Sequence, residues 1–133
     1  MVKVVLPGRP ITKKNHMKMV KNKKTGKMFP IQSDQYREYE EACLWILRMV
    51  PDKFYGPIWV KVLYWMPNRR GEPDLLGLLQ STADILEKAR VIDNDKNIKS
   101  FDGSRIVGID AARPRAEVEI QEWSGGSCQI CCL

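Results

Sequence analysis

Acidic residues at both ends of one amphipathic segment are the residues of this sequence best suited to chemistry. The segment runs from Glu72 to Asp95, with Glu72 and Asp74 at its start and Asp93 and Asp95 at its end. Two or three converging carboxylates are what a hard divalent cation such as Mg²⁺ requires. A helix between the two groups would bring them to one place if the chain folded back after it. The segment therefore predicts a metal site.

The same segment has the pattern of a helix with a buried side and a polar side. Pro73 suits the first helical position. Apolar residues recur on one face, and they are Leu75, Leu78, Leu79, Ala83, Leu86 and Ala89. A second face is polar along its whole length, and it consists of Asp74, Gly77, Ser81, Asp84 and Lys88. After the helix, the bend from Asp93 to Asp95 could direct two carboxylates back toward Asp74.

The elements that must position these residues predict an α/β fold, a small mixed sheet with two main helices packed on it. The other helix begins at an N-cap, Ser33 or Asp34, and ends near Val50, because Pro51 follows. The segment from Pro57 to Met66 is apolar on both parities, so we expect a central strand that is covered on both faces. Further strands are expected at Val2 to Leu6, Ile98 to Phe101, Ser104 to Ile109 and Arg115 to Glu122.

Charge is distributed unevenly along the 133 residues, whose formal net charge is +6. No acidic residue precedes Asp34, and nine of the 22 lysines and arginines do. The remaining thirteen face all 16 acidic residues, so a basic arm precedes a mildly acidic body. Thr25-Gly26 predicts a turn in this arm, and hence a basic hairpin over about 11–31 with its tip at Lys21 to Gly26. Such an arm is typical of phosphate binding, and a solvated lysine-rich loop is the alternative.

Length predicts one domain, residues 1–123, followed by a flexible tail, residues 124–133. The tail contains Cys128, Cys131 and Cys132, and His16 is the only histidine. A tetrahedral zinc site takes four ligands and the tail supplies three, so a structural zinc is expected to be shared between two chains. We expect no signal peptide, no membrane span and no disulfide framework, and therefore a cytoplasmic protein.

The run from Met66 through Asp95 resembles the core of the RusA family of Holliday-junction resolvases, small endonucleases of bacteria and prophages. The family pattern has a strand ending Met-Pro, a basic turn, an Asp-x-Asp-Asn start to a helix containing Asp-x-Leu, a short apolar link and an Asp-rich turn. The matching residues are Met66, Pro67, Arg69, Arg70, Asp74, Asp84, Leu86, Val91, Ile92 and Asp93 to Asp95. Pro10, Asn15, the basic hairpin and the closing strand at Arg113 to Trp123 are similar too, so the resemblance spans nearly the whole chain.

The resemblance implies a homodimer that binds four-way DNA junctions and cuts two strands in recombination and repair, with Mg²⁺ or Mn²⁺ as cofactor. By position, Asp74 matches the first aspartate of the family's pair and Asp95 the later catalytic one, with Asp93 as a neighbouring candidate. Branched DNA would then be the partner. The residues expected to contact its phosphates are Lys13, Lys14, Asn15, Arg69 and Arg70.

Three positions depart from the family pattern. Leu76 replaces the second aspartate, Gly77 the asparagine, and Gln80 a functional lysine. Because leucine cannot bind a metal, either the site is lost or Glu72 supplies the missing oxygen ligand. We favour a rebuilt site, because a purely structural helix would not need the Asp-rich turn and the charged polar face.

A rebuilt site also needs a cation in place of the family lysine, and Lys14 and Lys88 are the candidates. If the site is lost, Asp93 to Asp95 is a solvated turn and Asp74 is only a carboxylate favoured by the helix dipole. The protein would then be a branched-DNA-binding protein of the same fold without catalysis. A zinc-holding interaction protein is a third possibility.

Overall fold

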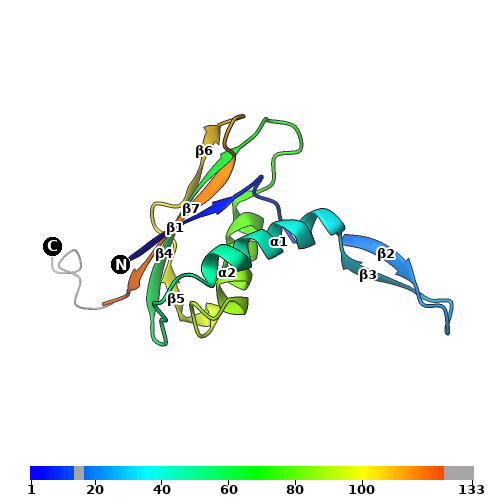
Figure 1. Ribbon diagram of the computed structural model, residues 1–133, viewed down its shortest axis with the longest axis horizontal. Helices are drawn as coiled ribbons and strands as arrows, with labels where there is room; N and C mark the ends of the chain where they lie inside the picture. Colours follow the sequence, from blue (N-terminus) through cyan, green and yellow to red (C-terminus); the bar gives the residue numbers. More distant parts are fainter. Residues whose placement is uncertain (14–16, 125–133) are drawn as a thin grey trace.

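A five-stranded mixed sheet forms one layer of the computed structural model, which describes residues 1–13 and 17–124 (Figure 1). Its strands follow the order β1-β7-β4-β5, with β6 also paired to β4. Strand β7 pairs antiparallel with both β1 and β4, whereas β5 and β6 run parallel to β4. The expected mixed sheet with β4 at its centre is confirmed. The bounds are β1 Val2–Pro7, β4 Ile58–Met66, β5 Ile98–Ser100, β6 Arg105–Ile109 and β7 Arg115–Glu122.

Two helices cover one face of this sheet, α1 Asp34–Leu47 and α2 Leu75–Lys88 (Figure 1). The hydroxyl of Ser33 caps α1 by accepting a hydrogen bond from the Tyr36 N–H at 3.2 Å. α1 ends at Leu47 rather than near Val50, because the chain there leaves the helix in a hydrogen-bonded turn. No helix of the described residues is long and apolar enough to cross a membrane.

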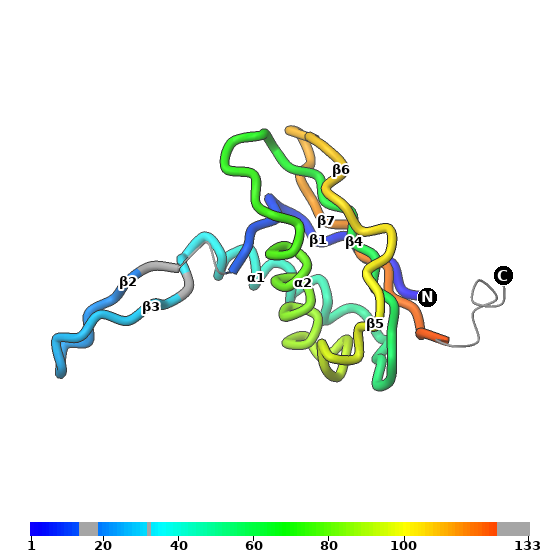
Figure 2. Tube along the Cα trace, turned by 180° about the vertical axis from the view of Figure 1, so that it is seen from behind, coloured from blue at the N-terminus to red at the C-terminus, as the bar shows by residue number. Residues whose placement is uncertain are grey.

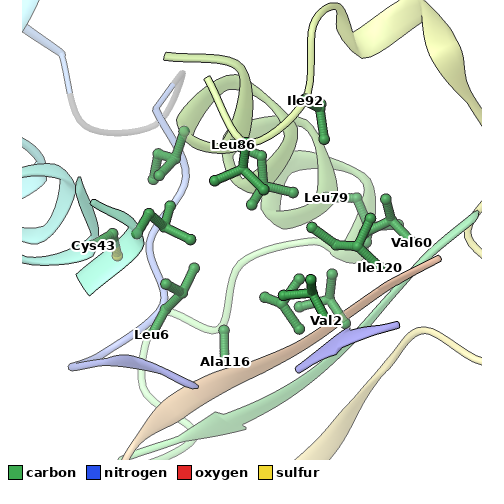
Figure 3. Close-up of a cluster of buried hydrophobic side chains, with 14 of the residues drawn as sticks. Val2, Leu6, Cys43, Val60, Leu79, Leu86, Ile92, Ala116 and Ile120 are labelled. Atoms are coloured by element: carbon green, nitrogen blue, oxygen red, sulfur yellow. The ribbon is translucent and has the colours of Figure 1, made fainter. Parts of the chain in front are cut away.

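The core lies between the sheet and the two helices (Figure 3). It joins Val2 and Leu6 of β1, Cys43 of α1 and Leu86 of α2. Burial raises the pKa of the Cys43 thiol to about 12, so this cysteine is protonated at neutral pH. The apolar face expected for α2 is confirmed, since Leu78, Leu79, Ala83 and Leu86 are buried.

The two faces of β4 differ, which corrects one expectation. Val60, Val62 and Tyr64 are fully buried under the helices. On the opposite face Trp59, Lys61, Leu63 and Trp65 are only half-buried, because neither α1 nor α2 packs there. Neighbouring side chains shield this face instead, and the Arg115 guanidinium lies 4.1 Å from the centre of the Trp65 ring.

A second, two-stranded sheet projects from the body. Its strands are β2 Met17–Lys21 and β3 Met28–Gln32, which pair antiparallel within the segment where a basic hairpin was expected. Figure 2 shows this hairpin standing away from the five-stranded sheet and from both helices. At its tip the Asn22 carboxamide oxygen accepts from the N–H groups of Lys24 and Thr25, and Gly26 adopts a φ of +74°. These bonds give the tip a defined shape.

Candidate metal and DNA-binding site

Asp74 ends the loop between β4 and α2 and caps the helix. Its carboxylate accepts a hydrogen bond from the Gly77 N–H at 3.0 Å. A Cβ atom at Gly77 would lie 2.9 Å from both Asp74 Oδ1 and Thr12 Cγ2. Glycine is therefore required for close packing here, because Thr12, from the segment after β1, occupies the space of a larger side chain.

Glu72 and Asp74 both line one pocket at the start of α2, which has a volume of about 370 Å³. The pocket also contains Arg9 and Thr12, neither of which was a candidate from the sequence. The full lining is Arg9, Pro10, Ile11, Thr12, Gly71, Glu72, Pro73 and Asp74. Two segments far apart in the sequence thus bring a guanidinium, a hydroxyl and two carboxylates together. The sequence of the Gly-Arg-Pro run after β1 does not indicate toward which element the Arg9 side chain is directed.

Two polar atoms of this pocket's lining residues are unsatisfied. The Thr12 hydroxyl and Arg9 Nε are buried and have no hydrogen-bond partner among the described residues. Arg9 Nη2 is held, because it donates to the carbonyl oxygen of Arg70 at 2.8 Å. Buried polar groups are nearly always hydrogen-bonded, so two orphans at one pocket require an explanation.

Two of the three positions that depart from the family pattern, Leu76 and Gln80, bring no charged group to this pocket, whose lining includes neither of them. The Leu76 side chain is 78 % exposed on the first turn of α2. The Gln80 carboxamide donates to Asp84 Oδ1 at 3.1 Å, one turn further along the helix. Neither residue supplies a carboxylate or a cation to Glu72 and Asp74.

Asp93 and Asp95 lie at the opposite end of α2. A helix of 14 residues separates them from Asp74 by about 21 Å. After α2 the chain enters a short 3₁₀ helix, η1 Asp95–Asn97, and then β5, where Ile98 pairs with Ile58 at the start of β4.

The expected return of these carboxylates toward Asp74 within one chain is therefore wrong. The physical reason is the pairing of β5, because the loop to Asp74 leaves from the other end of the nine-residue β4. Among the residues that the structure describes, no group of three histidine, cysteine or acidic side chains could hold a metal ion.

The far end of α2 carries charges that are already paired or capped. Lys88 Nζ lies 2.6 Å from Oε1 of Glu40, a nearly buried residue of α1. The Asp95 N–H donates to Glu87 Oε1 at 3.0 Å. Tyr36, one turn before Glu40 on α1, is buried, and its hydroxyl is a third buried polar atom without a partner among the described residues. Its pKa is raised, by burial first and by the Glu40 charge second, so its phenol stays neutral.

The candidate DNA contacts fall into three places. Arg69 and Arg70 are exposed in the loop after β4, beside the pocket at the start of α2. Lys13 lies midway along α2, where its N–H donates to the Ser81 hydroxyl at 2.8 Å, and its side chain lines a second pocket with Lys88. Lys14 and Asn15 lie outside the described residues, as do His16 and the cysteines of the tail.

The family model for endodeoxyribonuclease RusA matches residues 7–121. This range includes Arg9, Thr12, Glu72, Asp74 and both carboxylates at the far end of α2. No curated protein matches the sequence.

Proposed function

Because this chain belongs to the RusA family of endodeoxyribonucleases, we propose that it is a Mg²⁺-dependent nuclease that resolves four-way DNA junctions in recombination and repair. The observation that supports this proposal is the pocket at the start of α2, which joins Glu72 and Asp74 to a cation, Arg9. Carboxylates with an adjacent guanidinium suit phosphodiester hydrolysis, in which negative charge develops on a phosphate.

The donor set of this pocket fits a hard divalent cation in part. Glu72 and Asp74 provide the oxygen ligands that Mg²⁺ or Mn²⁺ prefers, and both line the same pocket. Such an ion would supply Lewis-acid charge for the hydrolysis. Glu72 thus takes the place of the family's second aspartate, whose position is occupied here by the exposed Leu76. A third carboxylate has to come from elsewhere.

A second copy of the chain provides that carboxylate. Glu72 and Asp74 lie at one end of α2 and Asp93 and Asp95 at the other, about 21 Å away. In a two-fold dimer with antiparallel α2 helices, each pocket would meet Asp95 and Asp93 of the partner subunit, and symmetry would form the site twice. In this arrangement the exposed Leu76, on the first turn of α2, would lie near the subunit interface.

The projecting hairpin is the second element that we assign to DNA. Lys21, Lys23, Lys24 and Lys27 are exposed at and near its tip, and no acidic residue occurs before Asp34. A basic ribbon of this kind suits the phosphates of a DNA arm, and its contribution to binding should fall steeply as salt rises. We expect weak dependence on base sequence, because shape recognition needs few base contacts.

A labelled four-way junction and a matching linear duplex test the proposal. We expect paired nicks in the junction with Mg²⁺, none in the duplex, and none with an Asp74→Asn variant. Asparagine is an equally good helix cap, so this variant should fold normally. The exposed Asp102 gives a matched control, and Asp102→Asn should cut at the parental rate.

Junction binding without catalysis is the second candidate function. It is favoured by the absence of a three-carboxylate group among the described residues of one chain and by Leu76 at the aspartate position. Tight junction binding without cleavage under either Mg²⁺ or Mn²⁺ would select it and exclude the nuclease. The zinc-holding alternative depends on the tail, which lies outside the described residues, and one zinc per chain or per dimer would support it.

A further inference from the structure

We propose that Arg9 and Thr12 bind the DNA phosphate at the start of α2, with Arg9 replacing the lysine that the family pattern has at Gln80. This inference rests on the proposed nuclease function and names the groups that hold its substrate. Both residues come from the segment that follows β1, and both line the pocket that contains Glu72 and Asp74.

The backbone of the loop between β4 and α2 holds Arg9 in place. Its Nη2 donates to the Arg70 carbonyl oxygen at 2.8 Å and lies 3.7 Å from the position of a Cβ on Gly71. Gly71 has a φ of +60°, which L side chains rarely adopt. One N–H of the guanidinium is used in this contact, and the buried Nε–H, which has no partner among the described residues, can donate to a ligand.

Thr12 provides an independent sign of a ligand. Its side chain is only 1 % exposed, it lines the pocket, and its hydroxyl has no partner among the described residues. A valine would fill the same volume without burying an unsatisfied hydroxyl. A phosphate oxygen that accepts from both Thr12 and Arg9 Nε would satisfy both orphan groups at once.

The Arg9 guanidinium favours a phosphodiester as this ligand. Gln80 is neutral and bonded to Asp84, so that turn of α2 supplies no cation to the pocket. Arg9 supplies one beside the two carboxylates, and a guanidinium binds phosphate with paired N–H donors. It would also stabilise the charge that develops on the phosphate during hydrolysis.

The first test compares Arg9→Gln and Arg9→Lys with Arg105→Gln. Arg105 is a matched control, because its guanidinium also donates to a backbone carbonyl, that of Gly103 at 3.2 Å, but on β6. In single-turnover cleavage at saturating Mg²⁺ and junction, we expect Arg9→Gln to be slower by about a hundredfold. Arg9→Lys should recover part of this loss, Arg105→Gln should match the parent, and Mn²⁺ affinity should be unchanged in all three.

The second test reads binding in the absence of metal. The Arg9 Nε–H resonance should shift when the junction is added, and Thr12→Val should weaken junction binding while leaving thermal stability equal or higher. Arg9→Gln cleavage within twofold of the parent, beside an inactive Asp74→Asn, would overturn the role of Arg9 and leave the nuclease proposal intact. If the parent does not cut DNA, the proposed function fails, and an Arg9 resonance unmoved at saturating junction then overturns this inference separately.

Discussion

Both ends of α2 have acidic side chains and a nearby cation, but the two ends differ in how their polar groups are bonded. At the start of the helix, an open pocket joins Glu72, Asp74 and Arg9, and a buried hydroxyl and a guanidinium N–H there have no partner in the part of the chain that the structure describes. At the other end, Lys88 is paired with Glu40. Backbone pairing and capping bonds hold the turn from Asp93 to Asp95 there.

This difference indicates that the start of α2 is the end that binds a ligand. Polar groups left unsatisfied in a folded chain reduce its stability, so two of them at one pocket are a sign of function there. The far end is satisfied through its backbone, while Asp93 is exposed and Asp95 is partly exposed. Such carboxylates are suited to reach a site on another molecule.

The largest effect on cleavage should come from substituting one aspartate at each end of α2 in separate variants. Asp74→Asn and Asp95→Asn should each slow cleavage by about a thousandfold, since a metal ligand contributes several kcal/mol. Mixing the two inactive variants and allowing subunits to exchange should restore about a quarter of the parental sites, because each mixed dimer keeps one intact site. A labelled junction should show single nicks rather than paired ones.

One outcome of subunit exchange would contradict a site built from the α2 helices of two subunits. If each site lay within one chain, both chains of a mixed dimer would remain defective, and the mixture would be as inactive as its components. Two copies of one variant, exchanged in the same way, provide the control. Analytical ultracentrifugation of each variant should first show that both form the dimer.

A smaller effect is expected from Gly77→Ala, which tests the packing at the pocket. Alanine in a helix normally stabilises by up to about 1 kcal/mol relative to glycine. Here its Cβ would lie 2.9 Å from Thr12 and from Asp74, so we expect a net loss of about 1–3 kcal/mol in thermal or urea unfolding. Cleavage should fall at least about tenfold as Asp74 is displaced.

Gly56→Ala is the matched control for that substitution. A Cβ there would have no atom within 4 Å, so the free energy of unfolding should change by less than about 0.5 kcal/mol. A Gly77→Ala variant as stable as Gly56→Ala, with parental cleavage, would show that the pocket tolerates movement. Close packing would then not distinguish the start of α2 from its other end.

The helices and strands could be predicted from the sequence. Which residues of different elements lie close together could not. Periodicity located α2 and its acidic ends, because helical spacing and caps are local properties. It could not place Asp95, since the pairing of β5 with the start of β4 decides on which side of the molecule the turn lies. Arg9 and Thr12 were missed for the same reason: only the folded chain brings the segment after β1 beside Asp74.

The smallest effect should come from Lys88, at the satisfied end of α2. Lys88→Met would leave the Glu40 carboxylate, which is 7 % exposed, without its partner at 2.6 Å. Because Lys88 is itself largely exposed, we expect a loss of about 1 kcal/mol, or about 3–5 °C in the midpoint of thermal unfolding. The exposed Lys53 gives the control, and Lys53→Met should unfold like the parent.

Cleavage by the folded Lys88→Met variant then decides which of the two cations binds the phosphate. A hundredfold loss would assign the phosphate contact to Lys88 of the partner subunit, whereas a parental rate leaves it to Arg9.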